Sequence, residues 1–185
     1  RHIKEHMPEA FDFDIPSVCA IAPGVLGVTG VETMDIVFGV ANKVKPDLII
    51  AVDALASRRA ARISTTIQLS DSGISPGSGV GNTRADLSRA NLGVPVIAVG
   101  VPLVVYASTI SQDTISLIAD ETGLHGDEER LRELAEQVIA KHMGDFIVTP
   151  KDIDVIVEDM AGIIANAINS ALFGNNLEQV RNMLA

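Results

Sequence analysis

The fold is decided by a run of five apolar residues that ends in a carboxylate, Leu48-Ile49-Ile50-Ala51-Val52-Asp53. A continuous apolar run of this length is typical of a strand that is buried on both faces. Residues 32–44, just before it, have apolar residues at helical spacing, and residues 17–22 form a second apolar run. Strand, helix and strand in this order predict a βαβ unit in which the two strands are parallel and adjacent.

The rest of the chain continues this alternation of strands and helices. The expected elements are an edge strand over 63–69, a buried strand over 96–101 ended by Pro102, helices over 109–120 and 126–142, an extended piece over 146–148, a long helix that begins at Pro150 with Thr149 as its N-cap, and a short helix or tail over 175–185. We therefore expect an α/β fold with a mostly parallel sheet flanked by helices. Residues 1–174 are expected to form one domain, and 175–185 its tail.

Composition narrows the class of protein. The chain has 185 residues, of which 47% are hydrophobic and only 3% aromatic, so the core is expected to be aliphatic. A net charge of −10 repels nucleic acid, and we expect no direct nucleic-acid partner. No apolar run approaches the roughly 20 residues that span a bilayer, so no membrane partner is expected. The single Cys19 is predicted to be a small buried residue, and the lack of a disulfide framework fits a reducing cytoplasm.

Asp53 is the first candidate for chemistry. Its predicted position just past the carboxyl end of a buried strand is where open α/β sheets place functional residues. A carboxyl group buried there can have a raised pKa and act as an acid or a base. The alternative is structural, because Asp53 would also suit the N-cap of a helix over residues 54–58.

The longest loop, over residues 71–82, is the second candidate, since long loops inside compact domains are often functional. Its segment Gly77-Ser78-Gly79-Val80-Gly81 suggests phosphate binding only weakly, because it lacks the Gly-Lys-Ser/Thr ending of a nucleotide loop. A glycine backbone that closely approaches a ligand or the floor of an active site is the better interpretation.

The remaining polar residues give weaker signals. Arg58, Arg59 and Arg62 are either counter-charges for a site near Asp53 or a solvated helix face. A serine-nucleophile motif is absent. His2 and His6 have the i, i+4 spacing that could share a ligand, but each histidine is expected to be a surface residue, and we expect no metal and no cofactor. These histidines are His2, His6, His125 and His142.

Five segments together resemble the germination protease family of endospore-forming bacteria. They are Ala22–Thr33, Lys45–Arg58, Thr66–Asn82, Gly93–Pro102 and Val148–Asp154. The resemblance covers about residues 10–174. Its most specific part is Ser75-Pro76-Gly77-Ser78-Gly79-Val80-Gly81-Asn82, which a generic βαβ protein would not reproduce.

The resemblance implies a cytoplasmic endopeptidase of the forespore and spore core. Family members are made as zymogens, form homotetramers and degrade small acid-soluble spore proteins during germination. Their fold is similar to that of the hydrogenase-maturation peptidases, which is phosphorylase/hydrolase-like. The family is regarded as an atypical aspartic peptidase with two essential aspartates. Its Ile-Asp-Ala-Leu-Ala motif matches Val52-Asp53-Ala54-Leu55-Ala56 here, so the resemblance implies that Asp53 is catalytic.

The other essential aspartate of the family lies in a Thr-Pro-Asp-x-x-Gly-Pro motif that this sequence does not contain. It is expected upstream of Arg1, so the chain is expected to be a fragment with half of the dyad, inactive by itself. Two alternatives stay open. One is a metal-dependent maturation peptidase of the same fold, which would need a carboxylate–histidine set near Asp53. The other is a non-catalytic fragment of the fold.

Overall fold

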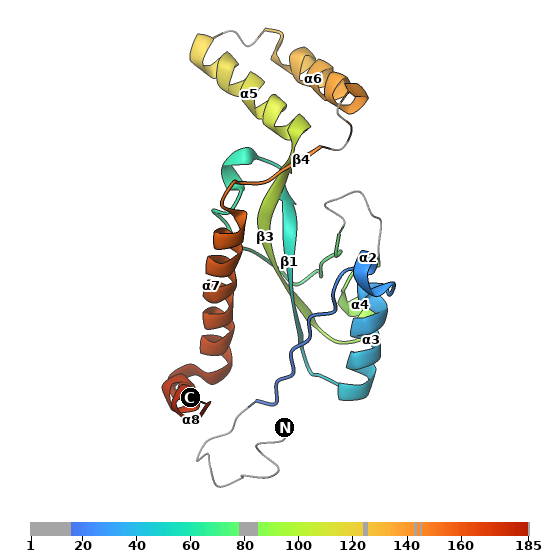
Figure 1. The fold of residues 1–185 in the computed structure, drawn as a ribbon, viewed down its shortest axis with the longest axis vertical. Helices are drawn as coiled ribbons and strands as arrows, with labels where there is room; N and C mark the ends of the chain where they lie inside the picture. Colours follow the sequence, from blue (N-terminus) through green and yellow to red (C-terminus); the bar gives the residue numbers. More distant parts are fainter. Residues whose placement is uncertain (1–15, 78–84, 124–125, 143, 145, 185) are drawn as a thin grey trace. The chain divides into compact units, whose positions relative to one another are not determined.

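The computed structural model describes residues 16–77, 85–123, 126–142, 144 and 146–184 (Figure 1). Its elements in chain order are α2 Leu26–Thr29, α3 Thr33–Val44, β1 Ile49–Ser57, η2 Ala60–Arg62, β2 Gln68–Ser70, α4 Arg89–Leu92, β3 Val96–Tyr106, α5 Ala107–Thr122, α6 Glu128–His142, β4 Ile147–Val148, α7 Ile153–Phe173, η4 Gly174–Asn176 and α8 Leu177–Leu184. The chain divides into two compact units, one of Arg1–Pro23 with Asp154–Ala185 and one of Gly24–Ile153. The prediction of a single domain over residues 1–174 stays a prediction.

The larger unit contains a four-stranded sheet with the order β1-β3-β2, in which β4 also pairs with β3. β1 and β3 are parallel, whereas β2 and β4 are both antiparallel to β3. The α/β class is therefore confirmed, but the sheet is mixed rather than mostly parallel. Residues 58–67, between β1 and β2, are fewer than the dozen or more that a parallel crossover needs, and the chain returns in the opposite direction.

β1 and β3 are both longer than their apolar runs predict. β1 continues beyond Asp53, and β3 continues through Pro102, so the predicted strand ends at these two residues are wrong. Leu55 pairs with Pro102, but Ala56 pairs with Val104, so one residue of β3 between them has no partner in β1. Such a bulge is a usual place for proline in a sheet, because proline has no N–H to donate to the ladder.

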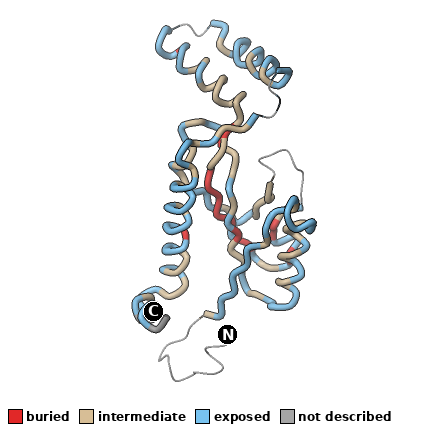
Figure 2. Tube along the Cα trace, viewed as in Figure 1, coloured by how far each residue is buried: buried red, intermediate tan, exposed pale blue. Residues whose placement is uncertain are grey.

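The core of this unit is aliphatic, as the composition predicts. A cluster of buried side chains is surrounded by partly buried ones, and Figure 2 shows burial concentrated along β3. The cluster consists of Ala51, Leu87, Leu92 and Val96, with Met34, Val37, Ile49, Ile74 and Val94 packed against it. Because side chains alternate along a strand, Ala51 and Asp53 project from the same face. Asp53 therefore lies at the border of the core.

The predicted strand over residues 17–22 is wrong, and so is its βαβ unit with β1. Residues 16–25 are neither helix nor strand, and no strand in the described part of the chain pairs with them. Val18 and Ala20 instead line a hollow of about 620 Å³ together with apolar residues of α7 and α8. Cys19 is exposed, which corrects the prediction that it is buried. An apolar run forms a strand only where a neighbouring ladder can pair with it.

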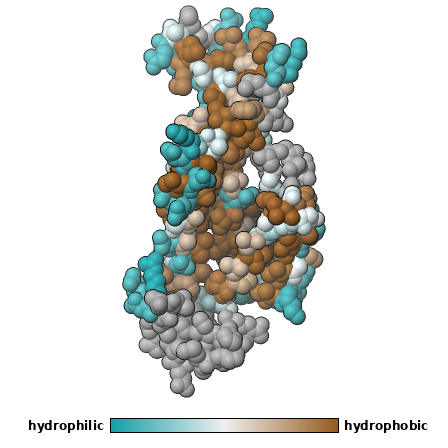
Figure 3. All heavy atoms as spheres, in the orientation of Figure 1, coloured by the Kyte–Doolittle hydropathy of each residue, from teal (hydrophilic) through white to brown (hydrophobic). Residues whose placement is uncertain are grey.

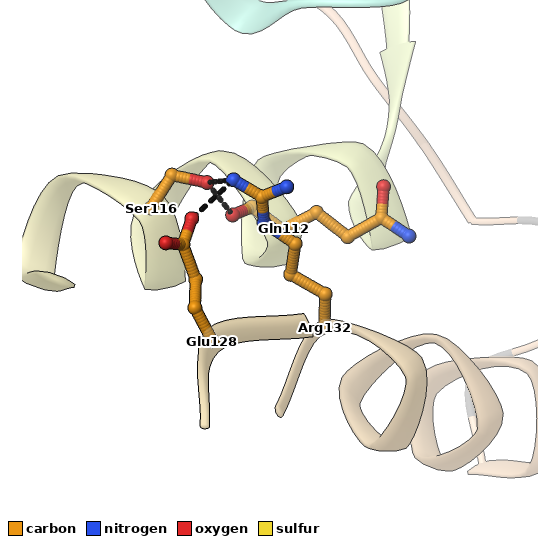
Figure 4. Close-up of polar contacts among 4 residues, drawn as sticks. All are labelled: Gln112, Ser116, Glu128 and Arg132. Atoms are coloured by element: carbon orange, nitrogen blue, oxygen red, sulfur yellow. Dashed lines mark hydrogen bonds and ion pairs between the residues drawn. The ribbon is translucent and has the colours of Figure 1, made fainter. Parts of the chain in front are cut away.

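Most of the helices lie where the sequence predicts them. α3, α5, α6 and α8 confirm their predictions, as does the extended piece at β4, while α7 begins at Ile153 rather than at Pro150. α5 and α6 form a hairpin held by polar contacts (Figure 4). In this hairpin Arg132 donates to Ser116 and pairs with Glu128. Figure 3 shows that apolar side chains also lie at the hairpin surface. Leu131 of α6 is half-exposed.

One helical stretch, Ile153–Asn176, is long and apolar enough to cross a membrane by length and composition. The expectation that no stretch approaches this limit is wrong by that measure. The match is weak evidence, because the core helix of a soluble protein passes the same test. The absence of a membrane partner stays a prediction.

Candidate active site

Asp53 lies inside β1, directly opposite Gly100 of β3. Both positions that the sequence suggested for it, past the end of a strand and at a helix N-cap, are therefore wrong. The residues that follow it, 54–57, remain in the strand because the lengthened β3 supplies their partners. The side chain is about half-buried at the edge of the aliphatic core.

Two backbone groups hold the carboxylate of Asp53. The N–H of Ala54 donates to Oδ1 at 2.9 Å, and the N–H of Gly77 donates to the same carboxylate. Burial raises the pKa of Asp53 above its ordinary value, and these two hydrogen bonds offset part of the rise because they favour the ionised form. Asp53 is thus a carboxyl group that holds its proton more readily than an exposed aspartate.

The arginine cluster does not act on this carboxylate. Arg58, Arg59 and Arg62 are exposed, and none of them forms an ion pair with Asp53 within the described residues. The interpretation as counter-charges that lower a carboxylate's pKa is wrong for Asp53. A solvated position agrees better with their exposure.

The glycine-rich loop reaches the site through its first half. Ile74 and Leu87 exchange two backbone hydrogen bonds, of 3.1 and 2.7 Å, which fix the loop against the segment before α4. Gly73 has φ +95°, and a Cβ there would lie 2.4 Å from the carbonyl oxygen of Leu87. The loop is therefore closely packed, and it places Gly77 beside Asp53. The backbone of Gly77 does approach Asp53 closely, whereas residues 78–82 lie outside the described part of the chain. That this glycine backbone meets a ligand or the floor of an active site stays a prediction.

A residue that sequence reasoning missed lies at the level of Asp53 in the sheet. Gly100 pairs with Asp53 on one side and with Gln68 of β2 on the other. Gln68 has no distinctive spacing in the sequence, and only the register of β2 reveals it.

The remaining candidates of the sequence add nothing to this site. His142 is exposed, and His2, His6 and His125 lie outside the described residues. Among the residues that the structure describes, no group of three or more histidine, cysteine or acidic side chains is placed to hold a metal ion. The expectation that the protein uses no metal or cofactor stays a prediction.

The raised pKa leads to a prediction about stability. A group whose pKa is higher in the folded state stabilises the fold fully at pH values below its pKa in the unfolded state, which is 3.8 for Asp53. This stabilisation is lost as the pH rises through the pKa of the folded state. Asp53→Asn removes the burial cost of the charge, so we expect the variant to be more stable than wild type at pH 7 and equally stable below the unfolded pKa. Urea unfolding across this pH range measures the difference. A variant that is less stable than wild type at neutral pH would contradict the prediction.

Comparison with known proteins assigns the chain to a family. A model of the germination protease family matches residues 1–130 and 122–183. The chain belongs to the germination protease family. It is 46% identical over 185 residues to the germination protease of Clostridium acetobutylicum, and 46% identical over 197 residues to that of Caldanaerobacter subterraneus subsp. tengcongensis. Identity to the germination protease of Bacillus cytotoxicus is 40% over 216 residues.

These germination proteases are longer than the chain. The alignments cover 93%, 100% and 93% of this chain in the order given, but only 57%, 61% and 59% of the relatives. The chain therefore spans about three-fifths of the length of the curated relatives it matches. The resemblance read from its sequence motifs is confirmed at the level of the family.

Proposed function

We propose that the full-length protein containing this chain is an endopeptidase that degrades small acid-soluble spore proteins during germination. Membership of the germination protease family supports peptidase activity. We further propose an aspartic-type mechanism in which Asp53 is one of two carboxylates. The observation that carries this step is a half-buried carboxyl group with a raised pKa, held by backbone N–H groups in β1, opposite Gly100 of the central strand β3.

Two carboxylates that share one proton can divide the work of peptide hydrolysis. The ionised one draws a proton from the attacking water, and the protonated one gives a proton to the carbonyl oxygen or the leaving amine. Burial suits Asp53 to such a pair, because it makes the protonated form accessible closer to neutral pH. The hydrogen bond of 2.9 Å from Ala54 fixes the orientation of the carboxylate and so of its proton. The apparent pKa values would belong to the pair rather than to Asp53 alone.

We place the second carboxylate in the part of the full-length protein that this chain does not contain. The relatives contain a further part in which it could lie, since the chain spans only 57–61% of the length of three of them. Production as a zymogen, assembly into homotetramers, location in the forespore cytoplasm and a fold similar to the hydrogenase-maturation peptidases belong to the same proposal. The metal-dependent alternative is less well supported, because no carboxylate–histidine set lies at Asp53 in the described part of the chain.

Cleavage assays on two lengths of the protein test this proposal. We expect the full-length protein to cleave a small acid-soluble spore protein and the 185-residue chain alone to give no detectable product, because one carboxylate cannot act as both acid and base. Mass spectrometry of the products measures both, and circular dichroism shows whether the short chain is folded. Cleavage by the folded short chain at a rate near that of the full-length protein would contradict a second carboxylate outside it. The absence of cleavage by the full-length protein would contradict the function.

A further inference from the structure

Three arginines lie together in the turn that follows β1. They are Arg58, Arg59 and Arg62, and all three are exposed. The N–H of Arg62 donates to the carbonyl oxygen of Arg59 at 3.1 Å, so the turn brings residues 59 and 62 close together. The stretch from residue 54 to residue 70 contains no aspartate or glutamate, although the chain as a whole has a net charge of −10. Residues 58–62, the arginine loop, therefore form a local positive patch in an acidic chain.

The backbone of the arginine loop is held in place from the protein interior. Ser57, which is only 4% exposed, accepts a hydrogen bond from the N–H of Arg59 at 3.3 Å and donates to its carbonyl oxygen at 2.5 Å. The N–H of Ala60 donates to Oδ2 of Asp113 in α5 at 2.7 Å. Just beyond the loop, Ser64 has φ +58°, a left-handed conformation that residues other than glycine rarely adopt. The loop thus has one defined shape, unlike a loose surface turn.

The guanidinium groups of the arginine loop have no negative partner within the described part of the chain. None of them forms an ion pair or a side-chain hydrogen bond there. Asp113, the carboxylate that contacts the loop, is engaged with the backbone N–H of Ala60 instead. Like charges this close repel one another, so the arrangement does not by itself stabilise the fold. An anion that binds to these groups relieves the repulsion and supplies the missing partner.

The ligand that suits this patch is a short run of carboxylates. A guanidinium binds a carboxylate through two parallel hydrogen bonds, and arginine clusters are a common means of recognising acidic peptide motifs. Nucleic acid carries phosphates along its whole length, so the acidic remainder of the chain would repel it beyond the loop. A few aspartates or glutamates in a peptide meet the three arginines without that repulsion.

We propose that the arginine loop is an exosite, a surface apart from the cleavage site that binds an acidic stretch of the protein substrate. This inference rests on the proposed peptidase function. Asp53 lies four residues before Ser57 in β1, and a strand advances about 3.3 Å per residue, so the loop begins roughly 13 Å from Asp53. An extended substrate covers that distance with about four residues. The acidic stretch is therefore at least about four residues from the bond that is cut beside Asp53.

Two matched peptides test the inference in the full-length protein. Both contain the same cleavable segment of a small acid-soluble spore protein, and they differ only in a run appended to one end, of glutamates in one peptide and of glutamines in the other. The run is tried at either end. We expect wild type to have a kcat/KM about ten times higher for the glutamate peptide at low salt, because several exposed ion pairs contribute together. The preference should lie in KM and should fall as salt is added, since salt screens exposed charges.

Variants of the loop show whether it is the source of this preference. Arg58→Gln, Arg59→Gln and Arg62→Gln in one protein should reduce the ratio of the two kcat/KM values from about ten to about one, and each single replacement should reduce it in part. Arg130→Gln is the matched control, because Arg130 is an exposed arginine of α6 outside the loop, and it should leave the ratio unchanged. A wild-type ratio near one, or a ratio that the triple variant keeps, overturns the exosite.

Binding measurements separate the exosite from the proposed function. If the full-length protein cleaves no spore protein, that function fails, but the dissociation constants of the glutamate and glutamine peptides, measured by isothermal titration calorimetry, still decide the exosite. Tighter binding of the glutamate peptide by wild type and not by the triple variant supports it, and equal binding overturns it. A single-stranded oligonucleotide that displaces the glutamate peptide at a lower concentration than a free acidic peptide does would overturn the assignment of a peptide as the ligand.

Discussion

Replacing Asp53 with asparagine in the full-length protein is expected to lower kcat for a small acid-soluble spore protein by about 10²- to 10⁴-fold, the usual contribution of a general acid or base. Asparagine has nearly the same shape, and its Oδ1 can still accept the hydrogen bond of Ala54. It cannot take up or release the proton at the pH of the reaction. The loss is therefore expected in kcat, with little change in KM. Steady-state kinetics with purified spore protein measure both values.

A matched control for this variant is Asp47→Asn. Asp47 is exposed and lies just before the same strand, so the change removes an equal charge without touching the site. We expect its kcat to equal that of wild type. An Asp53→Asn protein that keeps more than half of the wild-type kcat would contradict the assignment of Asp53 as a catalytic residue.

The pKa of Asp53 links this loss of activity to the stability prediction. Burial raises the pKa because it makes the charged form costly, and the same burial allows the protonated form to donate. Asparagine removes that cost, so the inactive variant is expected to be the more stable protein at neutral pH. A variant with lower activity but higher stability would identify a chemical role for Asp53, because replacing a purely structural residue would lower both the activity and the stability of the protein.

The sequence allowed the longer helices and the first parts of β1 and β3 to be predicted, because both depend on local patterns of apolar residues. The spacing of apolar residues is sufficient for α3 Thr33–Val44, and the run before Asp53 is sufficient for the first part of β1. The remainder of β1 depends on its pairing with β3 beyond Pro102, which is a non-local property. The setting of Asp53 was therefore predicted wrongly, and its catalytic role, which rests on its motif, stays a prediction.

Two other features of the site also depend on pairing. The run over residues 17–22 has the composition of a buried strand, but in the described part of the chain no ladder pairs with it. Gln68 has an ordinary sequence context, and only the register of β2 places it opposite Gly100, which also pairs with Asp53. Strand register places residues that are distant in the sequence directly opposite one another in the sheet. The apolar pattern within a single segment does not determine which residues of other strands it will pair with.

The loop that carries Gly77 gives the prediction with the largest expected effect on stability. We expect Gly73→Ala to destabilise the full-length protein by about 2–5 kcal/mol, from about 1–2 kcal/mol of backbone strain and about 1–3 kcal/mol of overpacking. Gly73 has φ +95°, which a residue with a Cβ rarely adopts. The new Cβ would also lie 2.4 Å from the carbonyl oxygen of Leu87 and 2.9 Å from the Cα of Ser88. Both are backbone atoms, so no side-chain rotation can relieve the contact. Urea unfolding measures the loss.

The matched control is Gly39→Ala in α3. A Cβ at Gly39 meets no atom within 4 Å, and alanine in a helix interior is more stable than glycine by about 0.5–1 kcal/mol. The two variants make the same chemical change, and we expect opposite signs. Gly73→Ala should also reduce activity, because displacing the loop removes the hydrogen bond from Gly77 that favours the ionised form of Asp53. Without that hydrogen bond the pKa of Asp53 rises further, so the pH profile of kcat/KM should shift to higher pH. Equal stability of the two alanine variants would contradict the close packing of the loop, and an unchanged pH profile would contradict the effect of Gly77 on Asp53.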